Sequence, residues 1–254
     1  MKQTIIAVIN QKGGVGKTTT AVNLAAQLAS ATAPVLLIDL DPQGNASSGL
    51  GLPKETLDPT TYEILLGHAT LDQAVRPTGR EGLFILPANA NLAAAEIELV
   101  PMMQRELVLR KALQVATYRY IVIDCPPALG LLTINALSAA DRILIPVQAE
   151  YYALEGLGQL LATVQRVRQA LNPSLDLLGV LLTMYDKRTS LSEQVMTELH
   201  NHFGDKLFKT VIPRNVRLAE APSFGKTIFE HDRWSKGARA YKNFVKEVTK
   251  RVSD

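Results

Sequence analysis

The stretch TIIAVINQKGGVGKTTT, residues Thr4–Thr20, decides the fold of this chain. Its first six residues, Thr4–Ile9, are almost continuously apolar and rich in β-branched side chains, which is typical of a strand buried on both faces. The glycine-rich loop that follows contains two lysines, Lys12 and Lys17, and leads into a helical pattern. Glycines between a strand and a helix let the backbone turn its N–H groups inward, so the sequence predicts an anion-binding nest at the start of the helix.

The loop matches the phosphate-binding pattern G-x-x-x-x-G-K-[ST] at its carboxyl end. Lys17 stands where the pattern needs a cation for the β- and γ-phosphates, and the hydroxyl of Thr18 can ligate Mg²⁺. The pattern would also place a glycine at position 11, but the sequence has Gln11 there and Lys12 next to it. The second lysine therefore requires an explanation of its own.

Carboxylates suited to a magnesium ion end two other predicted strands. The segment VLLIDLDPQGN contains Asp39 and Asp41, which lie on one face if the chain stays extended. The segment YIVIDCPP ends a buried strand at Asp124, in the position of an aspartate that holds Mg²⁺ directly or through water.

Composition places the chain among ordinary globular proteins and predicts a cytoplasmic location. Its 254 residues are 47% hydrophobic and 20% charged, and no apolar run approaches the roughly 18 residues of a membrane span. A single cysteine, Cys125, excludes an internal disulfide and a cysteine-only metal cage.

Short apolar runs alternate with helical patterns along the chain. The predicted strands are Thr4–Ile9, Val35–Asp39, Leu83–Leu86, Tyr120–Asp124, Ile143–Val147, Leu177–Thr183 and Leu207–Val211. The predicted helices are Thr18–Ser30, Leu92–Ala116 with a break or kink at Pro101, Leu154–Leu171, Ser190–Phe203 and Gly237–Val252. This alternation predicts an α/β fold with a doubly wound, mostly parallel sheet flanked by helices, like that of P-loop NTPases, in a single domain covering residues 1–254. Ligands of such sheets bind beyond the carboxyl ends of the strands.

Basic residues are concentrated in the last quarter of the chain. Residues 1–183 contain 13 Lys and Arg against 15 Asp and Glu, whereas residues 184–254 contain 14 against 9. This difference suits either a polyanionic partner or a well-solvated surface.

These motifs, together with IPRNVRLAEAPSFGKTI at Ile212–Ile228, resemble the deviant Walker-A ATPases, and more narrowly the ParA/Soj chromosome-partitioning ATPases. The resemblance extends from Ile5 to about Val252. It implies ATP and Mg²⁺ as cofactors and a homodimer that forms with ATP. It also implies a ParB-like centromere-binding partner that stimulates hydrolysis.

The resemblance also assigns roles to residues. Lys12 would reach the phosphates of the partner subunit's ATP, which explains the second lysine, and Asp41 would orient the attacking water. Asp39, Asp124 and Thr18 would surround Mg²⁺, while Pro213 and Asn215 would contact adenine. The loop residues implied in nucleotide binding are Lys12, Gly13, Gly14, Val15, Gly16, Lys17, Thr18 and Thr19.

Three functions remain to be separated: a DNA-partitioning ATPase, a MinD-like membrane-cycling regulator of cell division, and a metabolic or metal-centre ATPase. A nitrogenase-like iron–sulfur role needs two cysteines per chain, and the chain has one. The last helix has an apolar stripe from Tyr241 to Val252 that is more typical of a helix docked on the core than of a membrane anchor.

Non-specific binding to double-stranded DNA fits the charge distribution better, and predicts a nucleoid-associated protein. Phosphate contacts carry no base information and make binding steeply salt-dependent. The candidate residues are Arg188, Arg217, Lys226, Arg233, Lys236 and Lys242. A chromosomal and a plasmid role both remain open.

Overall fold

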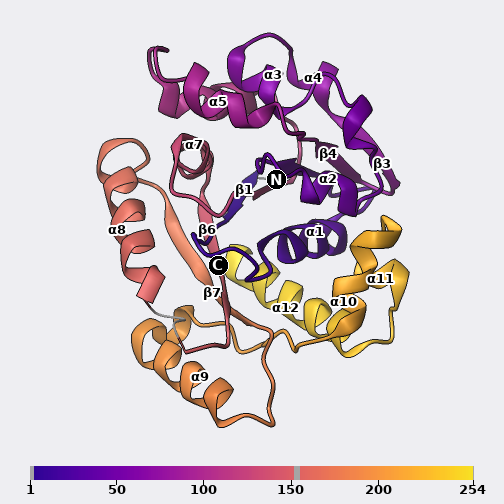
Figure 1. Ribbon diagram of the computed structural model, residues 1–254, viewed down its shortest axis with the longest axis vertical. Coiled ribbons are helices and arrows are strands. Elements are labelled where there is room, and N and C mark those ends of the chain that lie inside the picture. The colour runs from indigo at the N-terminus through magenta and orange to yellow at the C-terminus, as the bar shows by residue number, and fades with distance from the viewer. Residues whose placement is uncertain (1–2, 152–154, 254) are drawn as a thin grey trace.

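The computed structural model describes residues 3–151 and 155–253, which form one seven-stranded sheet covered by helices on both faces (Figure 1). The strand order is β3-β4-β2-β5-β1-β6-β7. All neighbouring strands are parallel except β3 and β4, which pair antiparallel at one edge. The predicted doubly wound α/β fold is confirmed.

The strands are β1 (Thr4–Val8), β2 (Val35–Asp39), β3 (Arg76–Arg80), β4 (Leu83–Leu86), β5 (Tyr120–Asp124), β6 (Arg142–Gln148) and β7 (Asp176–Thr183). The longer helices are α1 (Lys17–Leu28), α5 (Leu92–Glu98), α7 (Leu131–Ala139), α8 (Glu155–Ala170), α9 (Ser190–Phe203) and α12 (Lys236–Ser253). The short α-helices are α2 (Asn45–Gly49), α3 (Thr61–Leu66), α4 (Leu71–Ala74), α6 (Val108–Ala112), α10 (Val216–Glu220) and α11 (Ile228–His231). The 3₁₀ turns are η1 (Lys54–Thr56), η2 (Arg105–Leu107), η3 (Leu113–Val115), η4 (Gly204–Lys206) and η5 (Ala221–Phe224).

Alternate residues of each central strand enter two separate hydrophobic cores. In β1, Ile5 and Ala7 face the core beneath α7 and α8, whereas Ile6 and Val8 face the core beneath α1 and α12. Figure 1 shows these two helix layers on opposite sides of the sheet. The two-residue period of a strand accounts for both cores, since both faces of the sheet are buried.

The last helix is docked on the core, as its apolar stripe predicts. Its side chains Tyr241, Phe244 and Val248 are buried at 1% exposure or less against α1 and the sheet. The hydroxyls of Tyr241 and Thr20 lie 3.0 Å apart, which joins α12 to α1. None of the helices in the described part of the chain has the length and apolarity that crossing a bilayer requires.

Two predicted elements differ in the structure. Leu207–Val211 is not a strand, because Leu207 forms only an isolated bridge with Val180 beyond the edge strand β7. Leu92–Ala116 is not one helix; α5 ends at Glu98, and turns containing Pro101 separate it from α6. Pro101 cannot donate a helical hydrogen bond, which explains the interruption. The predicted helix start at Leu154 lies outside the described residues.

The strand β3 was not predicted because its sequence, RPTGR, has no aliphatic branched or aromatic side chain. It contains Pro77 and Gly79, both of which are unusual in a central strand. Its position at the antiparallel edge of the sheet removes that conflict, since an edge strand leaves one row of backbone groups unpaired.

Candidate functional site

The glycine loop lies at the carboxyl end of β1, where the sheet meets the N-terminus of α1. Gly14 and Gly16 have φ of 75° and 88°, in the left-handed region that side chains disfavour. The hydroxyl of Thr183, at the end of β7, donates a 2.8 Å hydrogen bond to the carbonyl oxygen of Val15. The predicted turn is therefore present and is attached to the neighbouring part of the sheet.

Asn10 and Gln11 fix the entrance of the loop. The side-chain amide of Asn10 donates to the carbonyl of Pro146 at 2.8 Å, and its oxygen accepts from the backbone N–H of Lys12 at 3.0 Å. The side chain of Gln11 donates to the carbonyl of Gly156 on α8 at 2.8 Å. The residue that departs from the usual glycine pattern thus joins the loop to α8, which the sequence pattern did not predict.

Lys17 is the first residue of α1 and is 7% exposed. Its Nζ donates a 3.0 Å hydrogen bond to the carbonyl oxygen of Lys12. Burial lowers the pKa of Lys17, while the nearby carboxylates of Asp124 and Asp41 act in the opposite direction. A cation in this position, beside an inward-turned loop and a helix N-terminus, can bind a polyphosphate.

Asp39 and Asp124 are paired in register on the adjacent strands β2 and β5, and both are fully buried. Burial raises the pKa of Asp39 to about 6, although hydrogen bonds from Ser47 lower it. Burial also raises the pKa of Asp124 well above its ordinary value, and the Asp39 carboxylate adds to this effect. The Thr18 hydroxyl is near enough to lower the pKa of Asp124 but does not meet hydrogen-bond geometry with it.

Neither carboxylate oxygen of Asp124 has a hydrogen-bond partner within residues 3–151 and 155–253. A buried, unpartnered carboxylate is costly unless a cation binds it, so Asp124 fits a metal ion. In the same described ranges, no three His, Cys, Asp or Glu side chains cluster as a metal cage. Such a sparse set fits Mg²⁺, which usually takes one or two protein carboxylates and fills its remaining positions with phosphate oxygens and water.

Asp41 is 7% exposed and follows the end of β2. Its Oδ1 accepts a 2.9 Å hydrogen bond from the backbone N–H of Gln43. Asp41 is close enough to Lys17 and Asp124 to influence the pKa of both. The structure therefore brings the three predicted aspartates to the same end of the sheet as the loop.

A cavity of about 330 Å³ adjoins the loop and contains the two residues that the resemblance links to adenine. Pro213 and Asn215 line it together with Gly16 and Thr19, and Tyr241 of α12 contributes to its wall. The Asn215 side-chain oxygen is buried without a hydrogen-bond partner in the described ranges. Met184 also lines the cavity with a φ of 51°, a strained conformation for a residue with a side chain.

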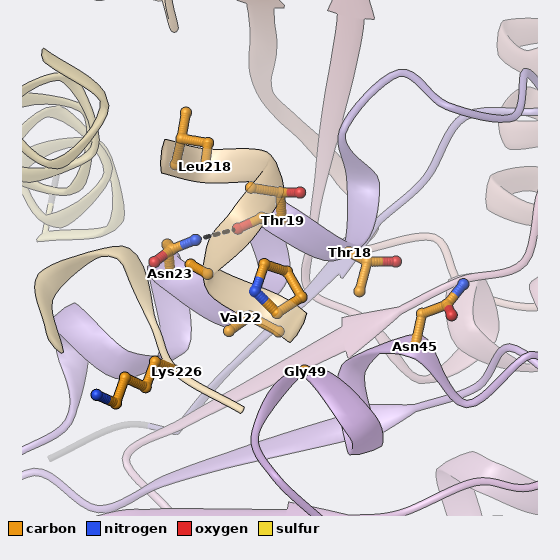
Figure 2. Close-up of a pocket in the computed structure, with 10 residues that line it drawn as sticks. Thr18, Thr19, Val22, Asn23, Asn45, Gly49, Leu218 and Lys226 are labelled. Carbon is orange, nitrogen blue, oxygen red and sulfur yellow. Dashed lines mark hydrogen bonds between the residues drawn. The ribbon is translucent and has the colours of Figure 1, made fainter. Parts of the chain in front are cut away.

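A second cavity of about 220 Å³ lies on the other side of the α1 N-terminus (Figure 2). Thr18 and Val22 of α1 face Asn45 and Gly49 of α2 across it, and Leu218 and Lys226 come from the chain around α10 and η5. This cavity lies between α1, which follows the glycine loop, and α2, which follows Asp39 and Asp41.

Lys12 is exposed, and its Nζ forms an ion pair with Glu150 of the same chain. Glu150 was not among the predicted site residues. Little in the sequence indicated this contact, because Glu150 is a single glutamate after β6 and belongs to no recognisable motif.

Four of the six predicted DNA-binding residues lie near one another in the chain, within residues 217–236, and the other two lie outside that range. Arg217, Lys226, Arg233 and Lys236 belong to the neighbouring elements α10 to α12, whereas Arg188 precedes α9 and Lys242 lies along α12. Lys242 lines a groove with Lys246 and Lys250, two lysines that were not predicted.

Arg188 and Arg217, two of the predicted DNA-binding residues, are both paired with carboxylates. Arg188 is 83% exposed and contacts Asp186 at 2.7 Å, which holds the pKa of Asp186 well below its usual range. Arg217 contacts Glu220 at 2.9 Å and Asp232 at 3.7 Å. A phosphate that binds either arginine therefore competes with a carboxylate that is already paired with it.

Comparison with known proteins identifies the family. Residues 3–177 match the family model described as an AAA domain. The chain is 56% identical to the sporulation initiation inhibitor protein Soj of Bacillus subtilis, over 96% of this chain and 97% of that protein. It is 53% identical to the chromosome partitioning protein ParA of Myxococcus xanthus, over 97% of this chain and 88% of that protein.

A solved structure described as cobyrinic acid a,c-diamide synthase from Mycobacterium smegmatis, with a bound ATP analogue and magnesium, has the same fold. It superimposes with a TM-score of 0.86 at 38% identity, covering 100% of this chain and 97% of that one. The chain belongs to the Soj/ParA family of chromosome-partitioning ATPases.

Proposed function

We propose that this protein is an ATPase that acts as a dimerisation switch in DNA partitioning. The observation that carries the proposal is the position of Lys17, buried in the glycine loop and close to the carboxylates of Asp41 and Asp124. The site can hold the phosphates of ATP on Lys17, the loop N–H groups and the N-terminus of α1. The family, and the ATP analogue bound to the similar Mycobacterium smegmatis structure, support ATP as the nucleotide.

Asp39, Asp124 and Thr18 are the residues that would hold Mg²⁺. When bound, the ion neutralises charge on the β- and γ-phosphates. Asp41 is not one of these metal-holding residues, but it lies close enough to Lys17 and Asp124 to influence the pKa of both. We assign it the task of orienting the water that attacks the γ-phosphate, because this task requires a carboxylate near the phosphates but not bound to the metal.

Pro213 and Asn215 would contact the adenine ring. Proline presents a rigid apolar surface, and an amide can pair with the donor and acceptor edge of the base. The unpartnered Asn215 oxygen and the cavity beside Gly16 and Thr19 support this assignment.

Lys12 would act across a homodimer interface, on the phosphates of the partner subunit's ATP. A cation supplied in trans stabilises the charge that develops during phosphoryl transfer, as an arginine finger does. ATP binding then favours the dimer, and hydrolysis releases it.

The ATP-bound dimer would bind double-stranded DNA without sequence preference through Arg188, Arg217, Lys226, Arg233, Lys236 and Lys242. A ParB-like partner would stimulate hydrolysis and release the protein from the nucleoid. The basic balance of residues 184–254 and the family membership support this role. The MinD-like membrane alternative is less well supported, since the apolar face of α12 is buried in the core.

The deciding experiment measures nucleotide-dependent dimerisation by analytical ultracentrifugation, with and without random-sequence duplex DNA. We expect dimers with ATP but not with ADP, and co-sedimentation of the dimer with DNA at moderate salt. A protein that binds anionic vesicles with ATP and ignores DNA would instead support the MinD-like function.

A further inference from the structure

The buried metal-site residue Asp39 is directly bonded to α2. Its Oδ2 accepts a 2.8 Å hydrogen bond from the backbone N–H of Ser47 and a 2.7 Å hydrogen bond from the Ser47 hydroxyl. Ser47 lies in the middle of the five-residue helix α2. A cation that binds the Asp39 carboxylate therefore competes with the two hydrogen bonds that this carboxylate accepts from Ser47 of α2.

The other end of α2 is held by Arg80, the last residue of the edge strand β3. The Arg80 side chain is 18% exposed and its guanidinium bonds three separate segments. Its Nη1 donates to the carbonyl of Leu50 at 3.1 Å, and its Nη2 donates to the carbonyl of Gly225 at 2.7 Å. Its Nε donates to both carboxylate oxygens of Glu230, at 3.0 and 2.9 Å.

These acceptors have defined places in the fold. Leu50 caps the C-terminus of α2, and Gly225 caps the C-terminus of η5. Glu230 accepts hydrogen bonds from the backbone and hydroxyl of Thr227 and so caps the start of α11. Arg80 thus joins the helix bonded to Asp39 to the elements η5 and α11, which lie between Arg217 and Lys236.

The backbones at this junction are in direct contact. Gly51 and Gly225 both have positive φ, 89° and 62°, and a Cβ atom added to Gly225 would lie 2.8 Å from the Cα of Gly51. A junction this tight does not allow α2 to move while η5 stays in place. Movement of α2 must carry η5 with it or break the Arg80 hydrogen bonds, as expected of a packed, bistable contact.

We propose that Arg80 is a positioning residue that couples the nucleotide site to the basic segment 217–242. The path runs from Asp39 through Ser47 and α2 to Arg80, and from there to Gly225 and Glu230. This inference rests on the proposed function, because it concerns how ATP binding alters DNA affinity. Arg80 contacts neither nucleotide nor DNA in this role.

Two variants of opposite charge test the coupling. Arg80→Gln removes a positive charge and Glu230→Gln removes a negative charge, yet both break the same junction. Arg76→Gln is the matched control, because Arg76 lies on the same strand but bonds the carbonyls of Val75 and Asp58 instead. For each protein, three quantities are measured: the affinity for a non-hydrolysable ATP analogue, dimerisation with the analogue, and the ratio of duplex-DNA affinity with the analogue to that with ADP.

We expect Arg80→Gln and Glu230→Gln to bind the analogue and dimerise like wild type, while the DNA-affinity ratio falls about tenfold, within the usual range of allosteric coupling. By thermodynamic linkage, DNA should also lose its effect on analogue affinity by the same factor. Arg76→Gln should keep the wild-type ratio. A purely electrostatic role would instead make the effects of Arg80→Gln and Glu230→Gln opposite in sign.

The inference is overturned if both junction variants keep the wild-type ratio, or if Arg76→Gln loses as much as they do. If thermal unfolding shows that Arg80→Gln is not folded, Arg80→Lys replaces it, because lysine keeps the positive charge but cannot bond all three segments as the guanidinium does. A wild-type DNA-affinity ratio in Arg80→Lys would also overturn the inference. A wild-type protein that binds DNA equally with the analogue and with ADP would contradict the proposed function itself.

Discussion

Lys12 and Glu150 form an ion pair within one chain. This contact keeps the lysine on its own subunit, whereas the proposed function needs it at the phosphates of the partner subunit. The two arrangements compete for one ammonium group. Dimerisation with ATP must therefore break the Lys12–Glu150 pair.

Replacing Glu150 by Gln should favour the ATP-bound dimer by about two- to fivefold, because exposed ion pairs contribute only modestly. Sedimentation velocity over a range of protein concentrations measures the change. Lys12→Ala provides the control, and should weaken the dimer while leaving monomer binding of ATP intact. A weaker dimer in Glu150→Gln would mean that Glu150 orients Lys12 for its task rather than retaining it.

Lys17→Ala should abolish tight ATP binding, because the loop loses its buried cation. The variant should fold at least as stably as wild type without nucleotide, since burial disfavours the charged lysine and lowers its pKa. A fluorescent ATP analogue measures affinity, and thermal unfolding checks the fold. Near-normal affinity in a folded variant would contradict the role of the loop.

Asp41→Ala and Asp39→Ala should separate the chemical step from metal binding. Asp41→Ala should form a dimer with ATP that persists, because the metal-binding residues remain and water is no longer oriented. Asp39→Ala should lose Mg²⁺-dependent binding and the Ser47 hydrogen bonds. Size-exclusion chromatography with ATP distinguishes them; a monomeric Asp41→Ala variant would place Asp41 in metal binding or folding.

Arg188→Glu should weaken duplex binding without changing ATP affinity. A dimer presents two copies, so the slope of log affinity against log salt should become shallower by about two units. Asp186→Asn is the informative counterpart, because it frees Arg188 from its ion pair and should tighten binding. Fluorescence anisotropy with two duplexes of scrambled sequence tests both variants, and equal affinities of wild type and Arg188→Glu would exclude Arg188 from the DNA surface.

Stability should respond to pH through Glu230. Burial pushes the pKa of this carboxyl upward, but hydrogen bonds from Thr227 and Arg80 outweigh burial and leave the pKa below its ordinary value. The ionised form therefore stabilises the folded state above the unfolded pKa of about 4.3, and this contribution is lost as the pH falls through the folded pKa. In urea unfolding at several pH values, the stability difference between wild type and Glu230→Gln should be largest near neutral pH and shrink below about pH 4. A difference that stays constant over this range would show that the ionised carboxylate is not the stabilising form.

The sequence predicted the parts of the fold that depend on local pattern. The run Thr4–Ile9 and the glycine loop after it carry their own periodicity and turn chemistry, so the strand, the turn and the start of α1 at Lys17 were predictable. Asp124 was placed at a strand end by the apolar run before it.

The features that depend on tertiary contact were not predictable. RPTGR forms β3 because β4 offers it an antiparallel partner. Leu207–Val211 is not a strand because its ladder pairing with β7 is limited to the isolated bridge between Leu207 and Val180. The Lys12–Glu150 pair joins residues that are more than a hundred positions apart. The Arg80 guanidinium joins β3 to Leu50, Gly225 and Glu230, which lie on unrelated elements. Spacing along the chain carries no signal for such contacts.

The contact between the Tyr241 and Thr20 hydroxyls means that the carboxyl-terminal helix forms part of the cavity that we propose for adenine. Removing residues 236–253 would take away a wall of this cavity as well as a basic surface. Loss of DNA binding in such a truncation would then report a damaged nucleotide site. Fluorescent fusions for imaging in cells are subject to the same constraint. A carboxyl-terminal tag is joined to the chain close to α12, so its linker should be long enough to leave α12 in place.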